Sequence, residues 1–347
     1  MKRRHHVRRP RVRAWTRLPD DELLKLRFCD LKLKLRGTRV APKIRRLYQE
    51  LDARELNFRP HCWLAEEWFS PDGTPGIAIP FYLAHPRLER LERRLMREVE
   101  GGNSNWLMRI LRHEAGHAID TAYRLRRRRG WREVFGPASL PYPDRYKPRP
   151  GSRRYVQHLD AWYAQSHPTE DFAETFAVWL KPRSRWRAHY ADWPAIEKLE
   201  FVEEAMHELR GRRPKVRNRA EIEPIASDQR TLGQHYRRKL ARYQRMRRTL
   251  ADAMIRRVFG APRAGTRIRA AATFMRRYKH DVRRAARRRT DASDYVIHQV
   301  LRLVIERCAA ARLTVNVPAR AARRNAVWLT LRLVKVLHQG STRSVTV

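Results

Sequence analysis

Apolar residues recur every three or four positions along several stretches of this chain, which is the spacing of one face of an α-helix. The clearest stretch runs from 106 to 129, after a capping side chain from Asn103 or Ser104. Gly116 interrupts it with a small residue, which suits a helix that packs closely against a neighbour. Another helix is expected to begin at Pro168. Further helices are predicted at 20–36, 42–56, 86–99, 194–210, 233–258, 266–288 and 293–311.

Strand-like runs are fewer. His61–Trp68 and Ile77–Leu83 flank the segment Ser70–Gly76, whose Pro, Gly, Ser and Asp residues are a strong turn signal. A β-hairpin is therefore expected here. Residues 313–317 and 327–337 alternate apolar and polar side chains like two further strands. The elements predict an α+β fold that is mainly helical.

The order of these elements divides the chain into four parts. Residues 1–17 are expected to form a basic, flexible arm, and residues 18–210 a mainly helical domain with the first hairpin. Residues 211–230 mix Pro, Arg and Asn without periodicity, so a linker is expected there. Residues 231–347 form a basic, mainly helical domain with the second hairpin.

The helix from 106 to 129 contains an H-E-x-x-H pattern, which begins at His113 and ends at His117. Residues four apart lie one helical turn above each other, so these two imidazoles can bind one metal ion. Zinc accepts such nitrogen ligands, and Glu114 lies where it can act as a base toward a water molecule at the metal. The alternative is that two histidines share an ordinary helix by chance.

A catalytic zinc ion usually has three protein ligands and one open position. In the helix that begins at Pro168, Phe172 and Phe176 lie on an apolar face, whereas Glu170 and Glu174 share a different face. Carboxylates on so apolar a helix need a partner if they are buried. We therefore expect Glu170 to be the third ligand and Glu174 to orient a ligand imidazole. The alternative is an exposed acidic face near a helix N-terminus.

Other acids and histidines leave the ligand set open. Asp160 competes with Glu170 as a ligand, but no acid follows it four residues later. Asp120 lies on the zinc-facing side of its own helix and is a third candidate. Three histidines near this region could stabilise an oxyanion, although surface or capping roles explain them more simply: His158, His167 and His189.

The pattern H-E-x-G-H-A-x-D, followed by E-x-F-A-E from Glu170, resembles the gluzincin metallopeptidases. It is similar to bacterial putative zinc-binding metallopeptidases, the Mlc titration factor group and the catalytic domain of anthrax lethal factor, over roughly residues 60–210. The resemblance implies a zincin-like domain in which Glu170 is the third ligand and Glu174 supports the site. By the same resemblance, Tyr163 stabilises an oxyanion or assists the leaving group, and Asp120 is a supporting acid.

The resemblance also implies a place for the substrate. In gluzincins a strand above the active-site helix pairs with an extended peptide, and Ile77–Leu83 is the candidate strand here. A simple structural hairpin is the alternative. The chain departs from the family pattern in its long, Arg- and Pro-rich connection from Arg124 to Arg154.

Composition adds information about partners. The formal net charge is +42, and only five acids occur after Thr231. Basic runs such as Arg287–Arg289 predict affinity for nucleic acid or for an acidic protein. Solvated helix faces in an arginine-biased protein are the alternative.

Compartment is indicated by what the sequence lacks. Cys29, Cys62 and Cys308 are far apart and form no C-x-x-C pair, which argues against a disulfide scaffold and favours a reducing compartment. The basic start is followed by no apolar signal region, and no apolar run is long enough to span a membrane. We expect a cytoplasmic protein without a membrane segment.

The function predicted from these features is zinc-dependent hydrolysis of peptide bonds in a peptide or protein substrate. The rival hypothesis is a nucleic-acid-binding or partner-binding protein with a structural or vestigial zinc site. Glu114 favours the enzyme, because a purely structural site has no need of that carboxylate.

Overall fold

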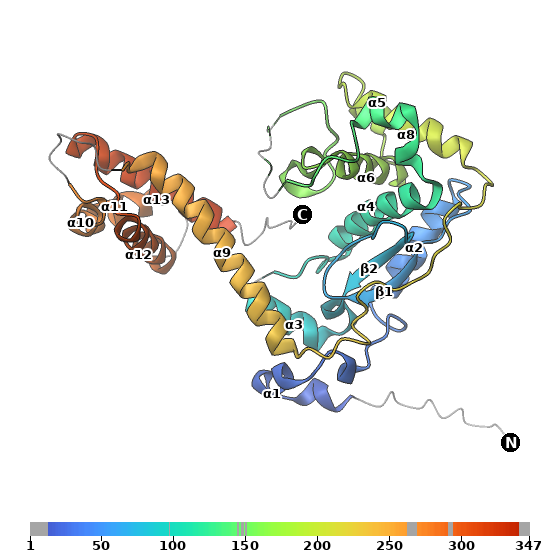
Figure 1. Cartoon of the computed structure of the whole chain (residues 1–347), viewed down its shortest axis with the longest axis horizontal. Coiled ribbons are helices and arrows are strands. Elements are labelled where there is room, and N and C mark those ends of the chain that lie inside the picture. The colour runs from blue at the N-terminus through green and yellow to red at the C-terminus, as the bar shows by residue number, and fades with distance from the viewer. Residues whose placement is uncertain are drawn as a thin grey trace. The chain divides into compact units, whose positions relative to one another are not determined.

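The computed structural model describes residues 13–96, 98–143, 146, 149, 151–261, 269–290 and 294–339. The chain divides into two compact units, the first ending at His235 and the second beginning at Tyr236 (Figure 1). Both units are mainly helical, and the first contains a two-stranded sheet. The expectation of an α+β protein with much helix is confirmed at this level.

The helices of the first unit include the two that carry the predicted site. They are α1 (Asp20–Lys25), α2 (Ala41–Asp52), α3 (Pro86–Met96), α4 (Ser104–Tyr123), α5 (Arg129–Phe135), α6 (Pro168–Leu180), α7 (Trp186–His189) and α8 (Ile196–Glu208). Asn103 caps α4, since its side-chain oxygen accepts a hydrogen bond from the backbone N of Trp106 at 2.8 Å. Pro168 begins α6, as the sequence indicates.

Several predicted helices are shorter in the structure, and two of them differ most from their expected bounds. The helix expected at 20–36 ends at Lys25, because the chain turns so that the backbone N of Phe28 can donate to the carbonyl of Arg230 at 3.0 Å. Only a short 3-10 turn, Cys29–Leu31, follows. The helix expected to reach residue 129 ends at Tyr123, where Arg124 adopts a left-handed conformation with φ of 57°.

The predicted hairpin is wrong in its topology. β1 (His61–Ala65) and β2 (Gly76–Pro80) pair in parallel, with His61 opposite Gly76. The chain does turn between these runs, but the residue that pairs antiparallel with β2 is Phe69 rather than a residue of β1. The backbone N of Ala78 donates to the carbonyl of Phe69 at 2.8 Å.

This arrangement leaves β2 with a partner on either side, β1 and Phe69. The run expected as an open substrate strand, Ile77–Leu83, is therefore an inner strand that ends at Pro80 and continues as a 3-10 turn, Phe81–Ala84. All five residues of β2 are buried.

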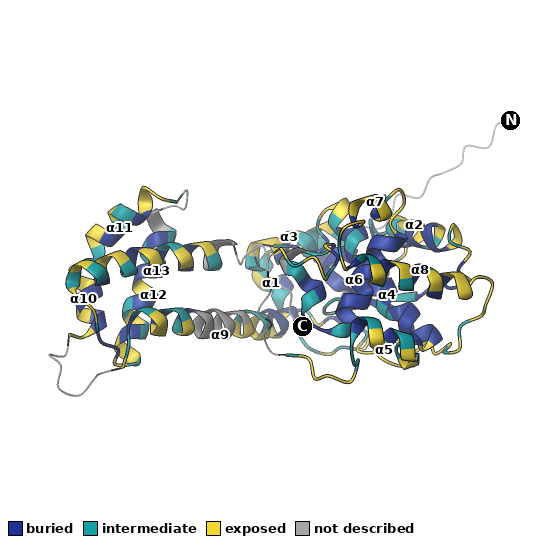
Figure 2. Cartoon of the chain, turned by 90° about the horizontal axis from the view of Figure 1, so that it is seen from above, coloured by how far each residue is buried: buried dark blue, intermediate teal, exposed yellow. Residues whose placement is uncertain are grey.

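The core of the first unit is built around α4 and α6, which pack against each other (Figure 2). Every residue of α6 from Thr169 to Leu180 is buried, and α4 is buried over most of its length. A helix buried on all faces needs a partner for each polar side chain that it carries. The buried carboxylates of α6 therefore need partners on the neighbouring elements.

The segment expected to be a linker, residues 211–230, lies along the first unit as extended chain. The backbone N of Val216 donates to the carbonyl of Ala122 at 2.9 Å, and that of Ile225 donates to the carbonyl of Leu64 at 3.0 Å. Ile225 is buried. The absence of periodicity in this segment reflects these extended contacts.

The second unit is a bundle of helices. α9 (Leu232–Val258) begins in the first unit and is followed by α10 (Ala271–Arg277), α11 (Lys279–Arg287), α12 (Asp294–Ala310) and α13 (Ala319–Gln339). The helix expected at 266–288 is thus divided at Tyr278 into α10 and α11. Its core contains large apolar side chains such as Phe259, Met275, Leu301 and Leu333.

The second predicted hairpin is also wrong. Residues 327–337 belong to α13, because Ala322, Ala326, Leu329 and Leu333 recur at helical spacing and all four are buried. The larger apolar residues of 327–337 alternate like a strand, whereas the helical spacing becomes clear only when Ala322 and Ala326 are included. For 313–317, the described residues show isolated bridges from Thr314 to Gly260 and Ala270 and no strand.

Candidate metal centre

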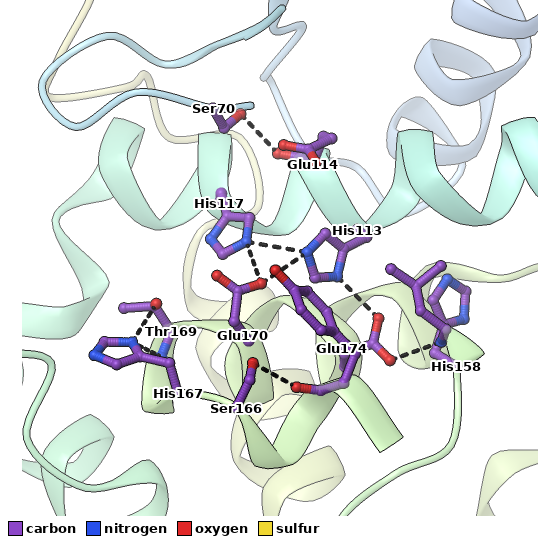
Figure 3. A network of polar contacts seen from close by, with 12 residues as sticks. Ser70, His113, Glu114, His117, His158, Ser166, His167, Thr169, Glu170 and Glu174 are labelled. Carbon is purple, nitrogen blue, oxygen red and sulfur yellow. Dashed lines mark hydrogen bonds and ion pairs between the residues drawn. The ribbon is translucent and has the colours of Figure 1, made fainter. Parts of the chain in front are cut away.

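Two helices supply the candidate metal ligands. α4 presents His113 and His117 from successive turns, and α6 presents Glu170 toward both (Figure 3). Oε2 of Glu170 lies 3.0 Å from Nε2 of His113 and 3.1 Å from Nε2 of His117. The two Nε2 atoms are 3.1 Å apart. Within the described part of the chain, these three residues form a group close enough to hold a metal ion.

Glu174, one turn after Glu170, forms a hydrogen bond with the first histidine. Its Oε1 accepts a hydrogen bond from Nδ1 of His113 at 2.9 Å, and its Oε2 accepts one from the backbone N of Leu159 at 2.7 Å. Glu174 is fully buried. This bond would keep the proton of His113 on Nδ1 and leave the lone pair of Nε2 available to a metal ion.

The residues present fit a zinc ion. Burial alone would lower the pKa of His113, but the hydrogen bonds to Glu170 and Glu174 outweigh it and hold that pKa well above its usual value, so the two buried carboxylates favour a positive charge at this point. Burial alone would raise the pKa of Glu170, but the two imidazoles outweigh it and hold that pKa well below its usual range. Two imidazole nitrogens and one carboxylate oxygen are a donor set that zinc accepts.

Glu114 has an unused carboxylate oxygen. Its Oε2 is buried and has no hydrogen-bond partner among the residues of the described ranges. Burial raises the pKa of this carboxyl, although His113 and His117 oppose the rise. The backbone carbonyl of Glu114 accepts a hydrogen bond from Oγ of Ser70 at 3.1 Å (Figure 3). Such an orphaned oxygen is available to a water molecule at the site.

Tyr163 lies against the first histidine. Its ring centroid is 5.5 Å from that of His113, and the side chain is buried. Burial raises the pKa of Tyr163 well above its usual value, and the carboxylates of Glu170 and Glu114 add to the rise. The hydroxyl therefore remains a hydrogen-bond donor at neutral pH.

Sequence reasoning missed Tyr142. Its hydroxyl donates to Oε1 of Glu170 at 2.8 Å, and its ring stacks on that of His167 with centroids 3.9 Å apart. Tyr142 belongs to the Arg- and Pro-rich connection from Arg124 to Arg154. The flanking Pro141 and Pro143 were a usable signal, because prolines on either side of an aromatic residue restrict its backbone.

The other candidate residues with described side chains contact groups other than the proposed ligands. The carboxylate of Asp120 accepts hydrogen bonds from Arg126, at Oδ1 from the backbone N (2.7 Å) and at Oδ2 from Nε (2.6 Å). The side chain of Asp160 lies outside the described residues. Of the three histidines, His158 contacts the carbonyl of Arg109, His167 caps α6, and His189 packs against the rings of Tyr190 and Trp193.

No helix in the described ranges has both the length and the apolar character of a membrane span.

Comparison with known proteins gives one relationship. No curated protein and no solved structure matches the chain. A family model described as "putative zinc-binding metallo-peptidase" matches residues 88–192, the span that contains His113, His117 and Glu170, and this match supports a relationship to that metallopeptidase family.

Proposed function

We propose that this protein is a zinc-dependent metallopeptidase that hydrolyses peptide bonds, with His113, His117 and Glu170 as the ligands. One observation carries the proposal: three electron-pair donors converge on one point, and the residue after the first of them, Glu114, keeps a buried carboxylate oxygen for which the described residues supply no partner. A purely structural site would leave that orphaned oxygen unexplained.

The proposed chemistry divides among the residues of the site. Zinc, when bound, supplies Lewis acidity, which lowers the pKa of a water molecule and polarises a carbonyl group. Glu114 takes a proton from the attacking water through Oε2 and delivers it to the leaving amine. Tyr163 donates its hydroxyl proton in a hydrogen bond to the carbonyl oxygen as negative charge develops there. Glu174 keeps Nε2 of His113 directed at the ligand position.

We infer that the peptide lies beside Phe69 rather than beside β2. Phe69 is the backbone partner of β2 on the side away from β1, so it forms the next edge of the sheet. Ser70, the following residue, reaches the backbone of Glu114 and brings that edge to the active-site helix. Extended backbone at a sheet edge can bond a peptide whatever its side chains.

The test combines metal analysis with hydrolysis by the full-length protein. Wild type should carry about one zinc ion per chain, because the site has one ligand set. His117→Ala should remove the metal, whereas Glu114→Gln should retain it and abolish cleavage of a peptide library. Tyr163→Phe should lower kcat more than it raises KM, because its hydroxyl acts in the transition state.

The controls separate the enzyme from its rival. Glu133→Gln changes a carboxylate that is exposed and paired with Arg129, so it should leave both zinc content and cleavage unchanged. Cleavage that survives Glu114→Gln would contradict the mechanism. Zinc-loaded wild type without any Glu114-dependent cleavage would favour a structural or vestigial site.

A second proposed activity concerns the second unit. Three exposed arginines lie at the C-terminal end of α11 and just after it: Arg287, Arg288 and Arg289. Few acids occur in the same unit. We propose that this unit binds an anionic polymer, with nucleic acid as the partner that clustered arginines suit best and an acidic protein as the alternative.

A further inference from the structure

We propose that Tyr142 is a positioning residue for the metal: it holds Glu170 so that a single carboxylate oxygen, Oε2, is presented to the ion. This inference rests on the proposed zinc site and adds a residue that the H-E-x-x-H motif and the Glu170 helix do not contain. It also gives a role to the Arg- and Pro-rich connection from Arg124 to Arg154.

The two oxygens of Glu170 have different partners. Oε2 faces the imidazoles, at 3.0 Å from His113 and 3.1 Å from His117. Oε1 accepts the hydrogen bond from the Tyr142 hydroxyl at 2.8 Å. Glu170 is buried, so water does not readily replace that donor. A carboxylate bonded in this way cannot turn to offer both oxygens to the metal without giving up the hydrogen bond from that hydroxyl.

Tyr142 is itself held in place by the start of α6. Its ring stacks on His167 with an angle of 15° between the planes, and its hydroxyl also contacts that of Thr169. Nε2 of His167 donates to the carbonyl of Leu140 at 2.8 Å, while its Nδ1 accepts from the backbone N of Thr169 at 3.2 Å. One histidine thus joins the connection to the same helix that carries Glu170.

The Tyr142 hydroxyl is the donor to Glu170, since a carboxylate oxygen accepts. The residue as a whole is 48% exposed, although its hydroxyl contacts two buried side chains, those of Glu170 and Thr169. The hydrogen bond from its hydroxyl to Glu170 explains why a large aromatic residue is placed at this partly exposed position.

The experiment compares two tyrosines that precede α6 in the full-length protein. Tyr142→Phe removes the hydroxyl that binds Glu170, whereas Tyr155→Phe removes one from a ring that lies under Nζ of Lys198. Zinc affinity is measured by competition with a chromophoric chelator, and the visible spectrum of the Co²⁺-loaded protein reports the coordination of the ion. The melting temperature of the zinc-free protein reports structural damage.

We expect Tyr142→Phe to weaken zinc binding by roughly 10–100-fold, the usual effect of removing a hydrogen bond to a ligand. We also expect it to change the Co²⁺ spectrum, because Oε1 becomes free to bind the ion. Tyr155→Phe should change neither. Unchanged affinity and an unchanged spectrum in Tyr142→Phe would overturn the inference, as would a decrease in affinity matched by an equal decrease in Tyr155→Phe.

The outcome also separates this inference from the proposed peptidase. If Tyr142→Phe alters zinc affinity and spectrum but Glu114→Gln leaves cleavage intact, the catalytic proposal fails and the positioning role stands. If wild type and Glu114→Gln both bind no zinc, the metal site fails and the role of Tyr142 fails with it. A lower melting temperature of zinc-free Tyr142→Phe with wild-type affinity would assign the hydroxyl to folding and overturn the inference.

Discussion

Gly116 and Ala173 meet where α4 crosses α6. A Cβ atom on Gly116 would lie 2.8 Å from Cα of Ala173, which is too close for any residue larger than glycine unless the helices move apart. Gly116 lies between the two histidines of α4, and Ala173 lies between Glu170 and Glu174 on α6. The close approach therefore sets the distance between the two halves of the metal site. The sequence predicted a small residue at a tight helix contact, and the structure confirms it.

Gly116→Ala should move α6 away from α4 and carry Glu170 with it. We expect the free energy of unfolding to fall by about 1–3 kcal/mol, the usual cost of overpacking a core, and zinc affinity to fall as well. Gly130→Ala in α5 is the control, because its Cβ would meet only a ring atom of Phe201 at 3.3 Å and it gains helix propensity. Urea denaturation and chelator competition measure both effects, and wild-type zinc affinity in Gly116→Ala would refute this account.

The sequence predicts those site residues that are related by short spacings along one helix, and it does not predict those that meet through long-range folding. His113, His117, Glu170 and Glu174 are paired by helical spacing, so two local patterns were enough to propose them and the structure brings them together. Tyr142 contacts Glu170 because the long connection folds back onto α6, and no hydrophobic periodicity predicts that path. Its role becomes visible only in three dimensions.

The errors in the fold have the same physical origin. The turn before β2 was recognised from its residues, but which strand pairs with β2 is a long-range choice between β1 and Phe69. In α13, larger apolar residues alternate over a few positions by coincidence, and Ala322 and Ala326 complete the helical stripe. Small buried residues carry little weight in a hydrophobicity pattern although they pack as fully as large ones.

Arg112, the residue before His113, should be a strong contributor to stability. Its guanidinium binds both oxygens of Glu50 at 2.7 Å, and both side chains are buried, so the pair joins α4 to α2. Arg112→Met should lower the free energy of unfolding by about 3–5 kcal/mol, because it leaves a buried carboxylate whose other cationic partner, Arg46, is half-exposed.

The matched control for Arg112→Met is an exposed pair. Arg59 binds Asp52 at 2.7 Å with 62% of its side chain exposed, so Arg59→Met should cost about 1 kcal/mol or less. Both variants are compared by urea denaturation. Equal losses of stability in the two would show that burial of the Arg112–Glu50 pair has no special weight.

His158 should make stability depend on pH. Burial lowers the pKa of this imidazole from its ordinary 6.5 to about 4, and its Nε2 donates to the carbonyl of Arg109 at 2.9 Å. Between these two values the unfolded chain binds more protons at this residue than the folded chain does. The free energy of unfolding should therefore rise with pH from about 4 to 6.5, by up to about 3 kcal/mol, and the gain should be complete above 6.5.

The measurement for His158 is a difference between two proteins. Wild type and His158→Gln are unfolded in urea with a chelator present, at several pH values from about 4 to 7, so that the metal ligands titrate alike in both. The slope should be smaller in His158→Gln. Parallel pH profiles would show that the proton uptake on unfolding comes from other groups.

The arginines at the end of α11 provide a test of the second unit. If the full-length protein binds nucleic acid through them, its affinity for a fluorescent single-stranded oligonucleotide should fall steeply with salt, because each neutralised phosphate releases counterions. Replacing Arg287, Arg288 and Arg289 by Gln should flatten the plot of log affinity against log salt by about one unit for each phosphate that these arginines no longer neutralise. Arg307→Gln is the control, since Arg307 is already bound to Asp252 at 2.6 Å through Nε. Affinity that is insensitive to salt, or an equal decrease per charge in Arg307→Gln, would leave these arginines as solvated surface or as a docking face for an acidic protein.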